Sequence, residues 1–205
     1  MPGLSTRFVG VAAGLTVTYM VVACSGTTAG TATPGPSSAP AASSSGLPVP
    51  TVAQPLPASV VQGDPCKALT DAQVDGLFTN TPTRDHAADD TGVAHACSWH
   101  DVDRGSLVTI QFVYAWKRGL TDVYATQAKG GFFKVLQPVQ GYPVVAYGPS
   151  DDRSRGRCGV AVGIADNAAF EADATVAQSA TGTGDPCEDA RNVANLALTT
   201  LKGGA

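Results

Sequence analysis

Four cysteines are the side chains whose chemistry the sequence constrains best: Cys66, Cys97, Cys158 and Cys187. The chain has no C-x-x-C or H-x-x-H spacing, which zinc sites typically use. In an exported protein, an even set of cysteines forms disulfide bonds instead. The sequence therefore predicts two disulfides and no metal site, and spacing alone leaves all three pairings open.

Histidines and carboxylates form a second candidate set in one polar segment: Asp85, His86, Asp89 and Asp90. Such a set could bind a metal ion or transfer protons, but a polar loop of this composition is more typical of a solvated surface. We favour the solvated surface. His95 and His100 are five residues apart on a predicted strand. They therefore point to opposite faces and cannot act together.

The sequence contains no catalytic motif: no G-x-S-x-G, no H-E-x-x-H and no cysteine with a matched histidine. We therefore predict that the protein is not an enzyme and uses no cofactor. A mechanism with two carboxylates leaves no sequence signal and stays an alternative. The net charge of −4 and the pI near 5.2 also predict no nucleic-acid partner, because nucleic acid requires a clustered basic surface.

Five side chains are candidates for contact with a ligand: Tyr142, Tyr147, Arg153, Arg155 and Arg157. The two tyrosines bracket Pro143 and are the aromatic residues that we expect to be most exposed. The three arginines could bind a phosphate or an acidic glycan. The neighbouring Asp151 and Asp152 favour a simpler interpretation, in which these charges only face solvent.

The N-terminus has the features of an export signal. Arg7 precedes a mostly apolar run from Phe8 to Ala23 that is short for a membrane span, which needs about 20 residues. The run ends in Val-Val-Ala before Cys24, which resembles the lipobox of bacterial lipoproteins. This resemblance implies a signal peptide over residues 1–23, lipid attached to Cys24, and a location on the outer face of the cytoplasmic membrane. The alternatives are an ordinary secreted protein and an uncleaved anchor.

Residues 24–63 follow as a segment rich in Ser, Thr, Ala, Gly and Pro. No Asp, Glu, Lys or Arg occurs between Phe8 and Gly63. Such a segment cannot bury enough apolar surface to offset its conformational entropy. We therefore predict a disordered tether, followed by a single folded domain over residues 64–205.

Two kinds of local pattern recur in this domain: capping motifs that begin helices, and alternating apolar runs that form hairpins. Asp64-Pro65 and Asp185-Pro186 each combine an N-cap residue with a proline at the first helical position, and Thr70 to Gln73 forms a capping box. Alternating apolar residues predict one hairpin within 92–116, with Val108, Ile110, Phe112, Tyr114 and Trp116 on one face, and a second within 158–176. Residues 79–91 are a loop or an edge strand, 120–128 a helix, and 132–136 and 141–147 short strands. The prediction is an α+β domain: an antiparallel sheet of about five strands, packed on one side by helices.

The spacing of these motifs resembles a family of actinobacterial, mycobacterial Lpr-type lipoproteins known only as a domain of unknown function. The matching motifs are Asp64-Pro65-Cys66, Cys97-Ser98-Trp99, Cys158-Gly159-Val160-Ala161-Val162 and Pro186-Cys187. The two-disulfide plan also resembles, more distantly, the extracellular sensor domain of a mycobacterial serine/threonine kinase. That resemblance implies the pairing Cys66–Cys97 and Cys158–Cys187, so that each bridge joins a helix start to a nearby hairpin.

Location and architecture thus constrain the function without specifying it. We expect a membrane-anchored, extracytoplasmic module of the cell envelope that binds an unknown ligand or protein. The alternative is a docking subunit of a membrane or secretion complex, and an envelope hydrolase is the least favoured class.

The first prediction concerns covalent structure. We expect the intact mass of the protein from its native membrane to fit a chain that begins at acylated Cys24. Four further thiols should become alkylated only after reduction. A mass that retains Met1, or four thiols free without reduction, would contradict export.

Overall fold

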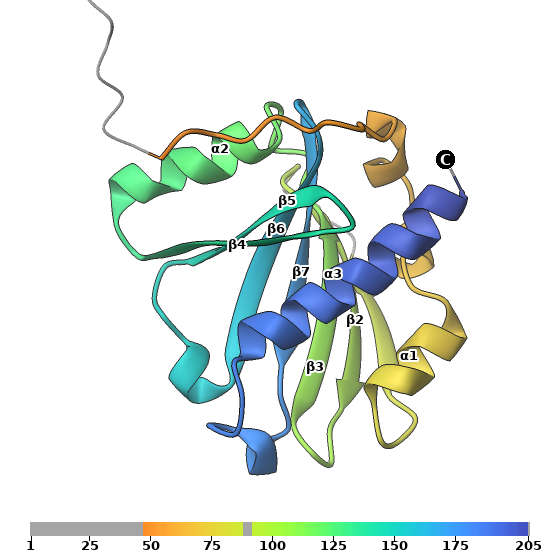
Figure 1. The fold of residues 1–205 in the computed structure, drawn as a ribbon. Coiled ribbons are helices and arrows are strands. Elements are labelled where there is room, and N and C mark those ends of the chain that lie inside the picture. The colour runs from red at the N-terminus through yellow and green to blue at the C-terminus, as the bar shows by residue number, and fades with distance from the viewer. Residues whose placement is uncertain (1–46, 88–91, 205) are drawn as a thin grey trace, which may run out of the picture. The chain divides into compact units, whose positions relative to one another are not determined.

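One antiparallel sheet organises the part of the chain that the computed structural model describes, residues 47–87 and 92–204 (Figure 1). Its seven strands lie in the order β1-β2-β3-β7-β6-β5-β4. The strands are β1 (Thr83–Ala87), β2 (His95–Asp101), β3 (Ser106–Phe112), β4 (Phe132–Val139), β5 (Tyr142–Gly148), β6 (Arg157–Ala165) and β7 (Ala168–Thr175). The predicted α+β class with an antiparallel sheet is confirmed. The sheet has seven strands instead of the expected five or so. One of them, β1, is an edge strand within residues 79–91, where a loop or an edge strand was expected.

Three α-helices and five short 3₁₀ turns complete the described part. The helices are α1 (Asp71–Leu77), α2 (Leu120–Tyr124) and α3 (Pro186–Gly203). The turns are η1 (Ala58–Val61), η2 (Pro65–Lys67), η3 (Ala125–Lys129), η4 (Arg153–Arg155) and η5 (Gln178–Ala180). No helix of the described residues is long and apolar enough to cross a membrane. The predicted signal peptide, Cys24, Asp89 and Asp90 lie outside these residues.

Helix-start chemistry operates as the sequence predicts. The Asp64 carboxylate accepts a hydrogen bond from Cys66 N at 2.9 Å, and the Asp185 carboxylate accepts one from Cys187 N at 3.0 Å. Thr70 and Gln73 form the reciprocal capping box of α1. Each of these local contacts satisfies a backbone N–H that a helix leaves without an internal partner.

Two disulfides join the capped starts to the sheet. Cys66 of η2 is bonded to Cys97 of β2, and Cys187 of α3 is bonded to Cys158 of β6. The sequence separations are 31 and 29 residues. This is the pairing that the resemblance to the kinase sensor domain implies. Since Cys97 and Cys187 are fully buried, both bridges belong to the main core.

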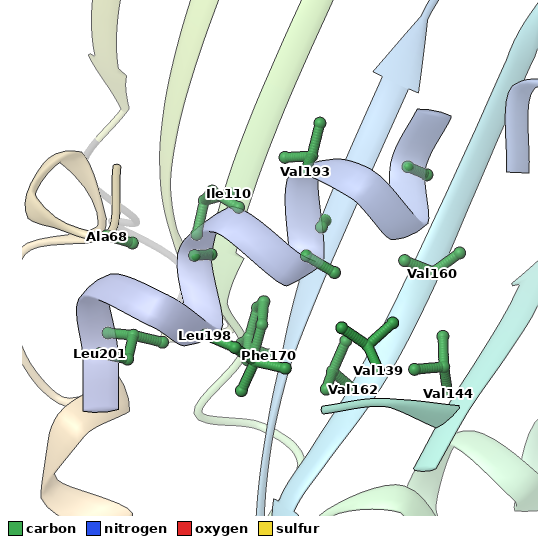
Figure 2. Packing of buried hydrophobic residues seen from close by; sticks show 14 of the residues in the cluster. Ala68, Ile110, Val139, Val144, Val160, Val162, Phe170, Val193, Leu198 and Leu201 are labelled. Atoms are coloured by element: carbon green, nitrogen blue, oxygen red, sulfur yellow. The ribbon is translucent and has the colours of Figure 1, made fainter. Parts of the chain in front are cut away.

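The main core lies between α3 and one face of the sheet. Figure 2 shows Leu198 of α3 directed toward Phe170 of β7, and Val193 and Val160 belong to the same buried cluster. The small residues Ala190, Ala194 and Ala197 of α3 have no exposed surface. They let the helix approach β6 and β7 closely, and burial of this face is the dominant stabilisation of the domain.

A second, smaller core lies on the opposite face of the sheet. There Leu120, Val123 and Tyr124 of α2 pack with Val145, Ala161 and Ala169. A Cβ at Gly163 would lie 2.7 Å from Leu120 Cδ1, so the glycine permits this close approach. The sequence prediction placed helices on one side only; α2 shows that both faces carry a helix.

Two predicted boundaries differ from the observed ones. Strand β3 ends at Phe112, so Tyr114 and Trp116 lie beyond the alternating run expected to include them. The folded part also begins before Asp64. Leu56 N donates a hydrogen bond to Ile164 O at 2.8 Å, and Val52 and Val60 pack against the main core. Scattered apolar residues in a Pro-rich segment carry no periodicity, which explains why this contact was not predicted.

The disulfides generate a prediction about stability. Replacing both members of one bridge, Cys158→Ala with Cys187→Ala, removes the cross-link of a loop of roughly 30 residues, which in the chain-entropy model costs about 3–4 kcal/mol. The melting temperature should fall by roughly 10 °C, since each kcal/mol corresponds to about 2–4 °C at this size. Thermal unfolding by circular dichroism measures the change.

Reducing agent provides the control for this prediction. It should lower the melting temperature of the wild-type chain more than that of the double variant, which has only one bridge to lose. An equal melting temperature of the wild-type chain with and without reductant would show that the bridges do not stabilise the fold.

Candidate functional site

A polar cleft lies on the face of the sheet opposite α3, beside the part that α2 covers. Its volume is about 430 Å³, within the range of small-ligand sites. Register places its floor residues in neighbouring rows across β3, β7 and β6: Thr109 beside Asp173 and Gly159, and Gln111 beside Glu171 and Ala161. Its walls come from β4, from the end of β5 and from the loop that follows: Phe132, Tyr147, Gly148, Pro149, Ser150 and Asp152.

Two carboxylates of β7 converge above one glycine in this cleft. A Cβ at Gly159 would lie 2.5 Å from Asp173 Oδ1 and 3.1 Å from Glu171 Oε1. Any larger residue at position 159 would push the carboxylates away. The glycine therefore lets both carboxylates lean close to the strand, with their oxygens near enough to each other for one ligand atom in the cleft to touch both.

Few protein groups balance these two carboxylates. Gln111 Nε2 donates a hydrogen bond to Asp173 Oδ2 at 3.1 Å, and Tyr147 is hydrogen-bonded to Glu171. The nearest cation is Arg157 at the rim of the cleft, where its positive charge acts on Asp173. Among the described residues, no ion pair joins Arg157 to a carboxylate.

Burial dominates the protonation of this pair. It raises the pKa of Glu171 to about 8, helped by the negative charge of Asp173 and opposed by the hydrogen bond from Tyr147. Burial also raises the pKa of Asp173 to about 6, opposed by Gln111 and by the charge of Arg157. The pKa of the Tyr147 hydroxyl is raised by burial and by Glu171. Both carboxyl groups therefore keep their protons to a higher pH than exposed carboxyl groups do.

Of the two tyrosines predicted to contact a ligand, one lines the cleft and the other is buried in the core. Tyr147 lines the cleft, where its ring meets the ring of Trp116 edge to face at 5.8 Å between centroids. Tyr142, expected to be exposed, is only 5% exposed and belongs to the main core. The alternation of β5 puts the two tyrosines on opposite faces, because Tyr147 comes five positions after Tyr142 and an odd step along a strand changes the face. Tyr142 is therefore a structural residue.

The three arginines predicted as ligand contacts lie in different surroundings. Arg153 packs over Phe132, with 4.8 Å from Cζ to the ring centroid, and forms an ion pair with Asp151 at 2.7 Å. Arg155 pairs with Asp152 at 2.8 Å. Neither is among the residues that line the cleft, while Arg157 is. The three side chains therefore do not form a common anion-binding lip.

The histidine and carboxylate candidates do not assemble a site in the described residues. Asp85 of β1 reaches His100 of β2, with 3.5 Å between Oδ2 and Nε2. His95 instead stacks edge to face on Tyr114 at 5.2 Å. Residues 47–87 and 92–204 contain no group of three or more His, Cys, Asp or Glu side chains that could hold a metal ion.

The residues central to the cleft were missed by sequence reasoning: Gln111, Gly159, Glu171 and Asp173. One signal was available, since Glu171 and Asp173 alternate with the apolar Phe170, Ala172 and Ala174 on a predicted strand. Such acids are normally assigned to solvent. Only the pairing of β7 with both β3 and β6 places them at the centre of the sheet.

These features define a class: a disulfide-linked α+β domain with one sheet face closed by a long helix and a polar cleft on the other. A family model described as "Protein of unknown function (DUF3558)" matches residues 19–200, and the chain belongs to this family. No curated protein and no solved structure matches the chain. The family description assigns no activity, so function must be argued from the cleft.

The raised pKa values predict how stability depends on pH. Between the ordinary carboxyl pKa values near 4 and the raised values, the folded chain binds more protons than the unfolded chain. This pair therefore makes stability fall as pH rises from about 4 to about 8. Tyr147, which faces the pair, does not titrate in this window, because burial and Glu171 raise its pKa above the ordinary value near 10.

Glu171→Gln tests this linkage, because a neutral amide cannot be forced to ionise. We expect its melting temperature at pH 8.5 to exceed that of the wild-type chain by at least about 2 °C, with a smaller difference at pH 5. Asp103→Asn, at an exposed turn, is the charge-matched control and should change neither value. A Gln variant less stable at pH 8.5 would show that ionised Glu171 stabilises the fold.

Proposed function

We propose that this protein is a membrane-anchored extracytoplasmic lipoprotein that acts by binding, and that the polar cleft is its ligand site. The observation that carries the proposal is the convergence of Gln111, Tyr147, Glu171 and Asp173 in one concave site of small-ligand size. The lipobox-like sequence before Cys24 supports the anchor. The two disulfides support an oxidising compartment.

Exposed apolar surface favours ligand binding over a docking role. The large apolar side chains exposed in the described residues are Leu47, Val49, Val93, Val102 and Val135. Val93 and Val102 flank opposite ends of β2, whereas Val135 lies on β4 at the far edge of the sheet, and Leu47 and Val49 precede η1. A docking surface requires a contiguous apolar patch. A docking subunit of a membrane or secretion complex is therefore less well supported than a binding module.

The carboxylate pair supports an envelope hydrolase as the second candidate. Glycoside hydrolysis typically uses two carboxyl groups, one protonated as general acid and one ionised, with pKa values pushed apart by their environments. Glu171 and Asp173 supply two carboxyl groups in one cleft, and burial raises the pKa of both. The residues that line the cleft do not indicate which bond would be cleaved, so we propose binding as the function.

The experiment is a titration of the purified, isotope-labelled chain with solubilised glycan and headgroup fractions of the cell envelope. We expect at least one fraction to shift the amide signals of Thr109, Gln111, Gly159 and Asp173. Asp173→Asn should weaken this binding by tenfold or more, as expected when a charged hydrogen-bond partner is lost. Asp103→Asn, which removes an exposed charge outside the cleft, should leave it unchanged.

The same samples separate the competing functions. Signal changes confined to residues outside the cleft would contradict the cleft as ligand site. Progressive release of new reducing ends, abolished by Glu171→Gln, would replace the binding proposal with the hydrolase.

A further inference from the structure

The cleft beside Gly159 has the charge of a site for a small cation. Position 159 lies within a strand, and its glycine has no left-handed backbone angle that would require the absence of a side chain. The reason for glycine is spatial: a Cβ would fall 2.5 Å from Asp173 Oδ1. Because position 159 has no side chain, both carboxylates lean close to the strand, and a ligand atom in the cleft space beside them can contact Asp173 Oδ1 and Glu171 Oε1 together.

The acceptors around this space match an ammonium group. An –NH₃⁺ group donates three hydrogen bonds. Glu171 and Asp173 supply two acceptors. The third is available from the amide of Gln111, which lines the cleft: its Nε2 donates to Asp173, so its carbonyl oxygen keeps its own accepting capacity. Calcium, by comparison, takes six to eight oxygen ligands and is poorly matched by two carboxylates.

Electrostatics favours a ligand that is a cation. Two like charges buried side by side destabilise each other unless a cation accompanies them. Arg157 stands at the exposed rim and does not fill this role by a direct ion pair with either carboxylate. Tyr147 adds an aromatic wall, and ring faces attract organic cations.

We propose that the cleft binds a protonated primary amine, with the ammonium group in the cleft in contact with both Asp173 Oδ1 and Glu171 Oε1. This inference rests on the proposed function, in that the cleft is the ligand site. The remainder of the ligand extends toward Phe132, Tyr147 and the loop at Pro149, which form the walls of the cleft.

The probe for the experiment is butane-1,4-diammonium, titrated into the purified, isotope-labelled chain at pH 8.5 and about 0.15 M salt, where unspecific attraction is screened. We expect saturable shifts centred on Gly159, Glu171 and Asp173. At pH 5 the apparent Kd should be at least tenfold higher, because a proton must leave each carboxyl group before it pairs with the ammonium. Butane-1,4-diol, the neutral analogue, should not bind.

Three variants make the test specific. Asp173→Asn and Gly159→Ala should each weaken binding of the diammonium probe by tenfold or more, the first by removing charge and the second by pushing the two carboxylates away from their positions. Asp103→Asn removes the same charge from an exposed turn and should bind as the wild-type chain does. Disulfide content and thermal unfolding of each variant establish that the fold is intact.

Several outcomes would overturn the inference. Calcium that binds at the same residues in place of the diammonium probe would make this a metal site. Equal binding of the diol, or binding that survives Asp173→Asn, would make the site one for neutral polar ligands. Absence of any diammonium-induced shift in the cleft would reject the amine while the envelope-fraction titration still tests the cleft itself.

Discussion

The alternation of β7 is the constraint on which the two halves of this domain depend. Phe170, Ala172 and Ala174 point into the core beneath α3 and are almost completely buried. Glu171 and Asp173, between them, must therefore point to the opposite face, because successive side chains of a strand alternate. Since β7 is the central strand of the sheet, residues of the neighbouring strands and of the cleft walls surround these two side chains and limit their contact with solvent. The same register that builds the core thus places two carboxylates in the cleft.

Local chemistry made much of the architecture predictable from the sequence. The helix starts at Asp64 and Asp185 depend on contacts within two residues, which a sequence displays directly. The hairpin of β6 and β7 follows from period-two alternation around the turn at Asp166 and Asn167. Predictions failed where the answer depended on distant pairing. Tyr142 illustrates this, since it belongs to the main core that α3 helps to form, and Lys202 Nζ of this helix lies 5.9 Å from the centre of the tyrosine ring.

The cleft was beyond sequence reasoning for a related reason. The pairing of β3 with β7 joins strands that are far apart in the chain, and it brings Gln111 to Asp173. Pairing of β7 with β6 then adds Gly159, whose lack of a side chain matters only because two carboxylates lean over it. Each of these residues is unremarkable alone. Their chemistry arises from adjacency across three strands, which neither composition nor periodicity encodes.

The energetic balance explains why such a pair argues for function. Burial disfavours both carboxylates in their ionised state, so the pair subtracts from stability near neutral pH and above. The main core and the two disulfides supply the stability that tolerates this cost. Amides at the two positions would keep the shape of the cleft without the unfavourable ionisation, so a purely structural role does not account for the acids. A cationic ligand that pairs with both carboxylates would offset the unfavourable free energy of their ionisation, because it supplies a positive charge between them.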